Sequence, residues 1–123
     1  MNFENISIGT DIEEIKRFAD KTLEKDSAFL NRIFTSKELE YSFKTKTSAH
    51  HLCARFCAKE AVVKALSEFN VTDVYYKDIE ILNKLNGQPF VIIEKYPQLK
   101  IKLTLSHDKN SAVAMVMIFN FSN

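Results

Sequence analysis

Acidic side chains near the N-terminus are spaced in a way that suits metal-assisted chemistry on a phosphate. Asp11 and Glu13 stand two residues apart, and both would point to the same side if the chain there is a strand. Mg²⁺ commonly takes one or two carboxylates together with substrate phosphates and water. The alternative interpretation is that these acids favour the N-terminus of a helix. Their spacing alone leaves both interpretations open.

A second group of charges falls four residues apart on one predicted helix. The segment over about 49–69 contains no Gly or Pro and is rich in Ala, Leu, Lys and Glu, which predicts a helix. Glu60 and Lys64 would share a face of it, within a second apolar stripe formed by Cys53, Phe56, Cys57 and Val63. The functional interpretation puts Glu60 on a metal and Lys64 on a phosphoryl oxygen. The alternative is a surface ion pair worth roughly 0.2–0.5 kcal/mol.

Three further features carry polar groups. Ser106 and His107 end an alternating segment, where a histidine either donates to a phosphate or is structural. Asn86-Gly87-Gln88-Pro89 predicts a hairpin turn. Zinc is a competing hypothesis, with His50, Cys53 and Cys57 along one helix face. No second Cys/His cluster completes such a site, so buried, apolar cysteines are favoured.

The remaining pattern predicts an α+β fold, with one long central helix packed on a mostly antiparallel sheet. Residues 6–12 predict a strand and residues 13–24 a helix. Thr35 and Glu38 form a capping-box pattern, which predicts a helix over 36–43. The segments 78–82, 90–94, 100–107 and 112–119 predict strands.

The chain has 123 residues and a net charge of +1, so we expect a single domain over 1–123. This charge gives no reason to expect nucleic acid or a membrane as a partner. A local excess of basic residues nevertheless suits a phosphate-rich ligand or an acidic protein surface; it comprises Lys44, Lys46, Arg55, Lys59 and Lys64. With no signal peptide and no membrane-length apolar run, we expect a cytoplasmic protein.

Five segments in this order resemble the holo-[acyl-carrier-protein] synthase family of 4'-phosphopantetheinyl transferases. They are IGTDIEEIKRF (8–18), RIFTSKELEY (32–41), ARFCAKEAVVKAL (54–66), DIEILNKLNGQPFV (78–91) and LSHDKNSAVAMVMI (105–118). The resemblance implies an enzyme of fatty acid biosynthesis that transfers phosphopantetheine from coenzyme A to a serine of apo acyl carrier protein. The other product is adenosine 3',5'-bisphosphate. The family also implies Mg²⁺ dependence and a homotrimer with coenzyme A between neighbouring subunits.

The resemblance assigns a role to each matching residue. Asp11 and Glu60 resemble the magnesium ligands, and Lys64 the lysine that contacts the coenzyme A phosphate. Arg17 resembles the residue that meets the acidic carrier protein. The positions that resemble the coenzyme A-binding surface are Arg55, Gly87, Pro89, Ser106 and His107.

Two departures from the family pattern lead to expectations of their own. The family usually has a glycine-bearing GTG-like turn after the long helix, where this chain has SEFNVT (67–72). The alternative function is therefore a catalytically reduced module that binds coenzyme A or the carrier protein. Glu13 adds a carboxylate that the small synthases usually lack, and we expect it to join or approach the metal.

Overall fold

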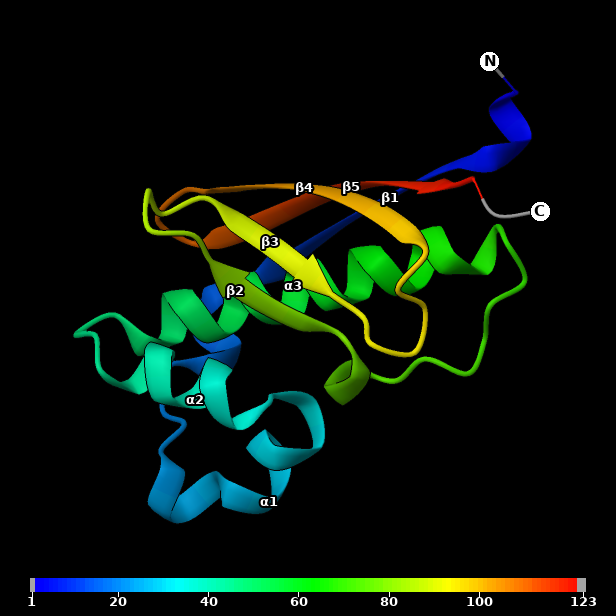
Figure 1. Cartoon of the computed structure of the whole chain (residues 1–123). Helices are drawn as coiled ribbons and strands as arrows, with labels where there is room; N and C mark the ends of the chain where they lie inside the picture. Colours follow the sequence, from blue (N-terminus) through cyan, green and yellow to red (C-terminus); the bar gives the residue numbers. More distant parts are fainter. Residues whose placement is uncertain (1, 122–123) are drawn as a thin grey trace.

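The computed structural model describes residues 2–121 (Figure 1). Three α-helices precede most of the strands, and every strand pairing is antiparallel within these residues. The strands are β1 (Ile6–Glu14), β2 (Glu80–Asn83), β3 (Pro89–Ile92), β4 (Leu99–His107) and β5 (Ser111–Asn120); the helices are α1 (Leu23–Ile33), α2 (Ser36–Phe43) and α3 (Ser48–Ser67); the 3-10 turns are η1 (Phe3–Asn5), η2 (Ile15–Phe18) and η3 (Tyr76–Asp78). The predicted α+β class is confirmed.

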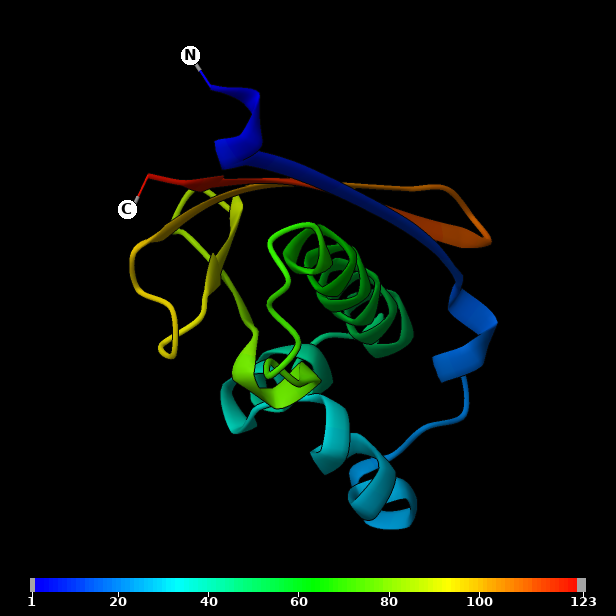
Figure 2. The ribbon, with the colours of Figure 1, turned by 90° about the vertical axis from the view of Figure 1, so that its right-hand side faces the viewer.

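A three-stranded sheet in the order β1-β5-β4 carries α3 on one face (Figures 1 and 2). Alternate residues of β5 point toward the helix and are buried; they are Ala112, Ala114, Val116 and Ile118. Both views show the three α-helices on this side of the sheet. The strands β2 and β3 form a separate hairpin beside α3.

The helix α3 is buried on two sides, which explains the second apolar stripe in its sequence. The sheet covers one side, and α2, η2, η3 and β2 pack against others. As a result Arg55 and Lys59 are buried with the apolar residues. These two residues therefore add no charge to the surface, contrary to the predicted basic region. Within residues 2–121, no helix combines the length and apolar composition that a membrane crossing requires.

The helix predicted over 13–24 is wrong. The strand β1 continues to Glu14, because Glu13 and Glu14 pair with Ala112 and Ser111 of β5. Beyond it, the backbone N–H of Ile15 donates to the Asn110 carbonyl at 2.9 Å, and η2 buries Ile15 and Phe18. Ile15 and Phe18 have a spacing that is typical of a helix, but a single 3-10 turn is enough to bury both of them. The helix α1 starts later, capped by Thr22.

The helix α2 begins with the predicted capping box, and its glutamate also reaches a buried lysine. Glu38 Oε1 accepts from the Thr35 backbone N–H at 2.8 Å and lies 2.8 Å from Lys59 Nζ, with both side chains fully buried. The other oxygen, Oε2, accepts from the Ile81 N–H. Lys59 donates to the carbonyls of Tyr76 and Ile79 at 2.8 and 2.5 Å. This Glu38–Lys59 network joins α2, α3, η3 and β2.

Gly9 lets β1 approach the backbone of α3, and we expect Gly9→Ala to cost about 3 kcal/mol of unfolding free energy. A Cβ at Gly9 would lie 2.1 Å from the Ala61 carbonyl oxygen and 3.0 Å from the Ala65 nitrogen. Urea unfolding measures the loss. Gly87→Ala is the control, since Gly87 has open space and only its φ of +89° opposes a side chain, at roughly 1 kcal/mol. Equal midpoints for the two variants would contradict the close contact.

Candidate active site

An ion pair between Lys64 and Asp11 joins α3 to β1. Lys64 Nζ lies 3.0 Å from Asp11 Oδ1 and donates to the Thr10 carbonyl at 3.0 Å. The Lys64 side chain is 55% exposed, whereas that of Asp11 is only 10% exposed. Hydrogen bonding to Asp11 and its negative charge raise the pKa of Lys64. The site therefore presents a charged ammonium to solvent beside a mostly covered carboxylate.

Glu60 is half-buried one turn before Lys64. Its Oε1 accepts a hydrogen bond from the Tyr76 hydroxyl. This hydrogen bond, together with burial, raises the pKa of Tyr76 to about 12, so the hydroxyl remains a donor at neutral pH. Among the described residues, Lys64 forms its ion pair with Asp11 and not with Glu60. The surface-pair interpretation of Glu60 and Lys64 is therefore wrong.

Sequence reasoning missed Tyr76. It lies in η3, just before the predicted strand over 78–82, and its partner Glu60 is 16 residues away in sequence. The only signal in the sequence was the residue type, because a tyrosine that becomes buried usually finds a hydrogen-bond partner for its hydroxyl.

Glu13 lies beside Asp11, as expected if the strand continues. Burial, followed by hydrogen bonding to Asp11 and the negative charge of Asp11, raises its pKa to about 7. Arg17 opposes this effect, since its Nη1 lies 3.2 Å from Glu13 Oε1. The two carboxylates of β1 therefore lie close together, and each is paired with a cation, Asp11 with Lys64 and Glu13 with Arg17.

These acids suit a hard cation whose other ligands come from a substrate. Asp11 Oδ2 is buried and has no hydrogen-bond partner, so one carboxylate oxygen is available to a cation. Within residues 2–121, no three His, Cys, Asp or Glu side chains gather closely enough to hold a metal by themselves. Mg²⁺ characteristically uses one or two carboxylates plus phosphates and water. The carboxylates of Asp11, Glu13 and Glu60 have the donor chemistry that this ion prefers, with the remaining ligands left to a phosphate and water.

A cavity of about 550 Å³ opens beside Lys64. Its wall is partly apolar, through Ile8 and Met115, and partly polar, through Ser67 and the Lys64 ammonium. Gly9 and Thr10 add the backbone of β1. Glu68 also lines the cavity, so the Lys64 ammonium, the Glu68 carboxylate and an apolar wall face the same space.

Arg55 is only 4% exposed, and the β2–β3 hairpin holds its side chain. It donates to Asn83 Oδ1, and its guanidinium lies 4.4 Å from the centre of the Tyr41 ring. Burial lowers its pKa. Asn83 Nδ2 in turn donates to the Gly87 carbonyl at 2.9 Å. Asn83 therefore links two of the predicted coenzyme A-binding residues, Arg55 and Gly87.

The turn at Asn86–Pro89 is the predicted hairpin turn. Gly87 has a φ of +89°, a conformation that glycine adopts without steric cost. Pro89 starts β3, where its missing N–H is tolerated. Gly87 is exposed and Pro89 half-buried, so both are accessible at this end of the molecule.

Ser106 and His107 end β4 and are exposed. Together with Ile12 they line a cavity of about 230 Å³. The His107 ring lies 6.1 Å from that of His50, which is near the start of α3. His107 therefore lies near the first turns of α3, about three turns of helix from Glu60 and about four from Lys64.

Arg17 has a side chain that is 51% exposed. Its guanidinium lies 4.8 Å from the centre of the Phe56 ring, and it forms the ion pair with Glu13 described above. A cation held in this way can meet an acidic partner while keeping part of its charge in solvent.

The cysteines behave as buried apolar residues of α3. Cys53 and Cys57 Sγ donate to the carbonyls of Glu13 and Asp11 at 3.7 and 3.1 Å. Burial raises the pKa of Cys53 to about 11 and that of Cys57 to about 12. Since zinc ligation requires thiolates, these protonated thiols favour the buried, apolar interpretation.

The turn after α3 keeps a left-handed residue although it has no glycine. Asn70 has a φ of +59°. Its N–H donates to the Ser67 carbonyl at 3.0 Å, and the Val71 N–H donates to the Leu66 carbonyl at 3.2 Å. These two bonds define a Schellman motif, in which asparagine can replace glycine. The missing GTG-like sequence therefore does not remove the helix-ending turn.

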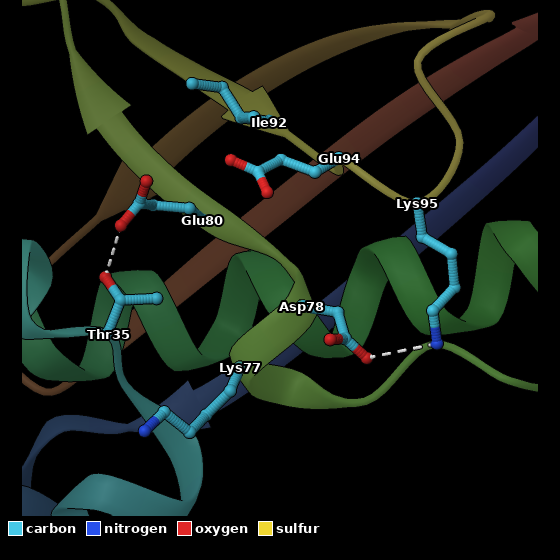
Figure 3. A pocket seen from close by; sticks show the side chains of 7 residues that line it. All are labelled: Thr35, Lys77, Asp78, Glu80, Ile92, Glu94 and Lys95. Carbon is cyan, nitrogen blue, oxygen red and sulfur yellow. Dashed lines mark hydrogen bonds and ion pairs between the residues drawn. The ribbon is translucent and has the colours of Figure 1, made fainter.

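A separate cavity of about 240 Å³ lies between η3, β2 and the segment after β3 (Figure 3). Thr35 Oγ1 donates to Glu80 at 2.6 Å, and Lys95 lies 3.8 Å from Asp78. None of the predicted site residues lines this cavity.

The sequence and the fold match those of a known class of transferase. Residues 7–116 match the family model of the 4'-phosphopantetheinyl transferase superfamily. The chain belongs to this superfamily, as the five segments predicted.

The more specific similarity is to holo-[acyl-carrier-protein] synthases. That of Thermodesulfovibrio yellowstonii is 43% identical over 114 residues, covering 90% of this chain and 96% of that protein. The synthase of Geotalea daltonii is 40% identical over 118 residues, covering 89% and 94%. A crystal structure of the Bacillus anthracis synthase in complex with CoA (3',5'-ADP) has a TM-score of 0.78 and 31% identity, covering 93% of this chain and 96% of that chain.

Proposed function

We propose that this protein transfers the 4'-phosphopantetheine arm of coenzyme A to a serine of apo acyl carrier protein, releasing adenosine 3',5'-bisphosphate. The observation that carries the proposal is the pairing of Lys64 with Asp11 at 3.0 Å, one helical turn from the half-buried Glu60. Similarity to synthases over about nine-tenths of the chain supports it. The test is incubation with coenzyme A, Mg²⁺ and apo carrier protein, which should add one phosphopantetheine mass to the carrier.

The proposed metal is Mg²⁺, held by Asp11 and Glu60 with Glu13 beside them. When bound, it would neutralise charge on the coenzyme A pyrophosphate. The Lys64 ammonium adds a further positive charge for a phosphoryl oxygen or the leaving group. Phosphoryl transfer depends mainly on such positioning and charge neutralisation.

The attacking serine hydroxyl must lose a proton, and Glu60 is the proposed acceptor, directly or through one water. A general base has to lie within hydrogen-bond reach of the proton that it takes. Glu60 combines partial exposure with a fixed position, since Tyr76 holds its Oε1. Lys64 then serves as the source of positive charge beside the departing phosphate.

The proposed binding surfaces extend from this centre. Ser106 and His107 at the end of β4, and Gly87 and Pro89 in the hairpin, are accessible for coenzyme A. Arg55 would contribute mainly by fixing the hairpin through Asn83. Arg17 is the proposed contact for the acidic carrier protein.

We expect Glu13→Gln to raise the Mg²⁺ concentration for half-maximal transfer about tenfold, the size typical of groups that support a metal ligand. The reason is that Glu13 lies close enough to Asp11 for the two charges to interact, so its ionised carboxylate would add to the attraction for the cation. Titrating Mg²⁺ in the transfer assay measures the change. Glu14→Gln is the matched control, since its side chain is 66% exposed and points to the other side of β1. An unchanged Mg²⁺ requirement in Glu13→Gln would remove Glu13 from the metal site.

A homotrimer is also proposed. The face of the three-stranded sheet opposite α3 exposes Ile8, Ile12, Val113 and Met115, with fractions of 59%, 66%, 36% and 45%. Exposed apolar patches commonly mark protein–protein contacts. Light scattering is expected to give three times the chain mass. A stable, fully active monomer would contradict the trimer.

The alternative, a binding module with reduced catalysis, was suggested by the missing GTG-like sequence, where this chain still forms a helix-ending turn through Asn70. Failure to modify any of several apo carrier proteins would restore that alternative. A single domain over 1–123, a cytoplasmic location and a role in fatty acid biosynthesis stay predictions.

A further inference from the structure

Tyr76 connects Glu60 to a part of the fold outside α3. The tyrosine is half-buried in η3, and its hydroxyl donates to Glu60 Oε1. Without this bond, a glutamate side chain on a helix retains rotamer freedom that must be lost when it binds a ligand. The bond removes part of that freedom before any ligand arrives.

Buried contacts fix the position of Tyr76 itself. Its backbone carbonyl accepts from Lys59 Nζ at 2.8 Å, and its ring packs edge-on against Phe56 with 5.5 Å between ring centres. Lys59 is the residue just before Glu60. Two adjacent residues of α3 therefore hold opposite ends of one tyrosine, one through its backbone and the other through its hydroxyl. The pairing of Lys59 with Glu38, fully buried, anchors the arrangement.

We propose that Tyr76 is a positioning residue, which orients the Glu60 carboxylate for the divalent cation. The inference rests on the proposed function, since it requires Glu60 to be a metal ligand. Hydrogen-bond partners of metal-binding carboxylates typically contribute 10–100-fold to metal affinity or activity. A tyrosine hydroxyl suits this task because it donates a hydrogen bond without adding a charge.

The test compares Tyr76→Phe with the wild type. Mn²⁺ binding, followed by electron paramagnetic resonance in the presence of coenzyme A, is expected to weaken about tenfold. The Mg²⁺ concentration for half-maximal transfer should rise by the same factor. Tyr75→Phe is the matched control, because it removes the same hydroxyl from a neighbouring side chain that is 71% exposed.

Each possible result either supports or overturns the positioning role of Tyr76. Weaker Mn²⁺ binding in Tyr76→Phe alone, with an unchanged melting temperature, supports the positioning role. Equal or tighter binding than in the wild type overturns it, as does an equal loss in Tyr75→Phe. If the wild type transfers phosphopantetheine and Tyr76→Phe binds Mn²⁺ as tightly as the wild type, the positioning role of Tyr76 is overturned and the proposed function stands. A wild type that binds no Mn²⁺ and transfers nothing overturns the proposed function as well.

Discussion

Glu60→Gln is expected to lower the rate of phosphopantetheine transfer by about 10²–10⁴, the contribution typical of a general acid or base. Glutamine keeps the shape of the side chain and can still accept a hydrogen bond from Tyr76. It lacks the negative charge that would bind the cation and the basicity that would accept the serine proton. Initial rates of carrier modification at several Mg²⁺ concentrations measure the loss.

The matching control is Glu24→Gln on α1, which removes a carboxylate from an exposed position. It is expected to keep the wild-type rate. Glu60→Gln should also unfold close to the wild-type temperature, since the substitution is nearly isosteric. A Glu60 variant with a rate within a few-fold of the wild type would remove Glu60 from the centre of the reaction.

Lys59→Met is expected to lower the free energy of unfolding by about 3–5 kcal/mol, as found when one partner of a buried ion pair is removed. The Glu38 carboxylate would stay fully buried without its cation. The carbonyls of Tyr76 and Ile79 would also lose the ammonium that donates to them. Equilibrium unfolding in urea measures this effect.

Two variants show whether the charge imbalance causes the loss. Lys44→Met breaks the exposed Lys44–Glu40 pair and should cost at most about 0.5 kcal/mol. Adding Glu38→Gln to Lys59→Met removes the unpaired charge, so the double variant should be more stable than Lys59→Met alone. A Lys59→Met cost below about 1 kcal/mol would show that the Glu38–Lys59 network does not join these elements as described.

The elements that the sequence predicted well are those determined by local interactions. The capping box of Thr35 and Glu38 placed α2 correctly, because both partners lie within one helical turn. The long helix runs Ser48–Ser67, close to the predicted range of about 49–69. The strands β4 and β5 also lie within about one residue of their predicted limits.

Long-range pairing accounts for what could not be predicted. The helix expected over 13–24 failed because Glu13 and Glu14 pair with β5, about 100 residues further along the chain. Lys64 likewise forms its ion pair with Asp11, which is 53 residues away in the sequence, and not with the nearby Glu60. The role of Tyr76 is visible only after η3 has folded against α3. Spacing identified the charged residues, and the tertiary fold determined their partners.

The most direct test of the central claim is the mass of an apo acyl carrier protein after incubation with this protein, coenzyme A and Mg²⁺. We expect one added phosphopantetheine per carrier, an equal amount of adenosine 3',5'-bisphosphate, and no addition when the acceptor serine is replaced by alanine. The addition should be strongly slowed by Glu60→Gln. If no member of a panel of apo carrier proteins is modified, although this protein is folded and Mg²⁺ is present, the proposed transfer activity is contradicted.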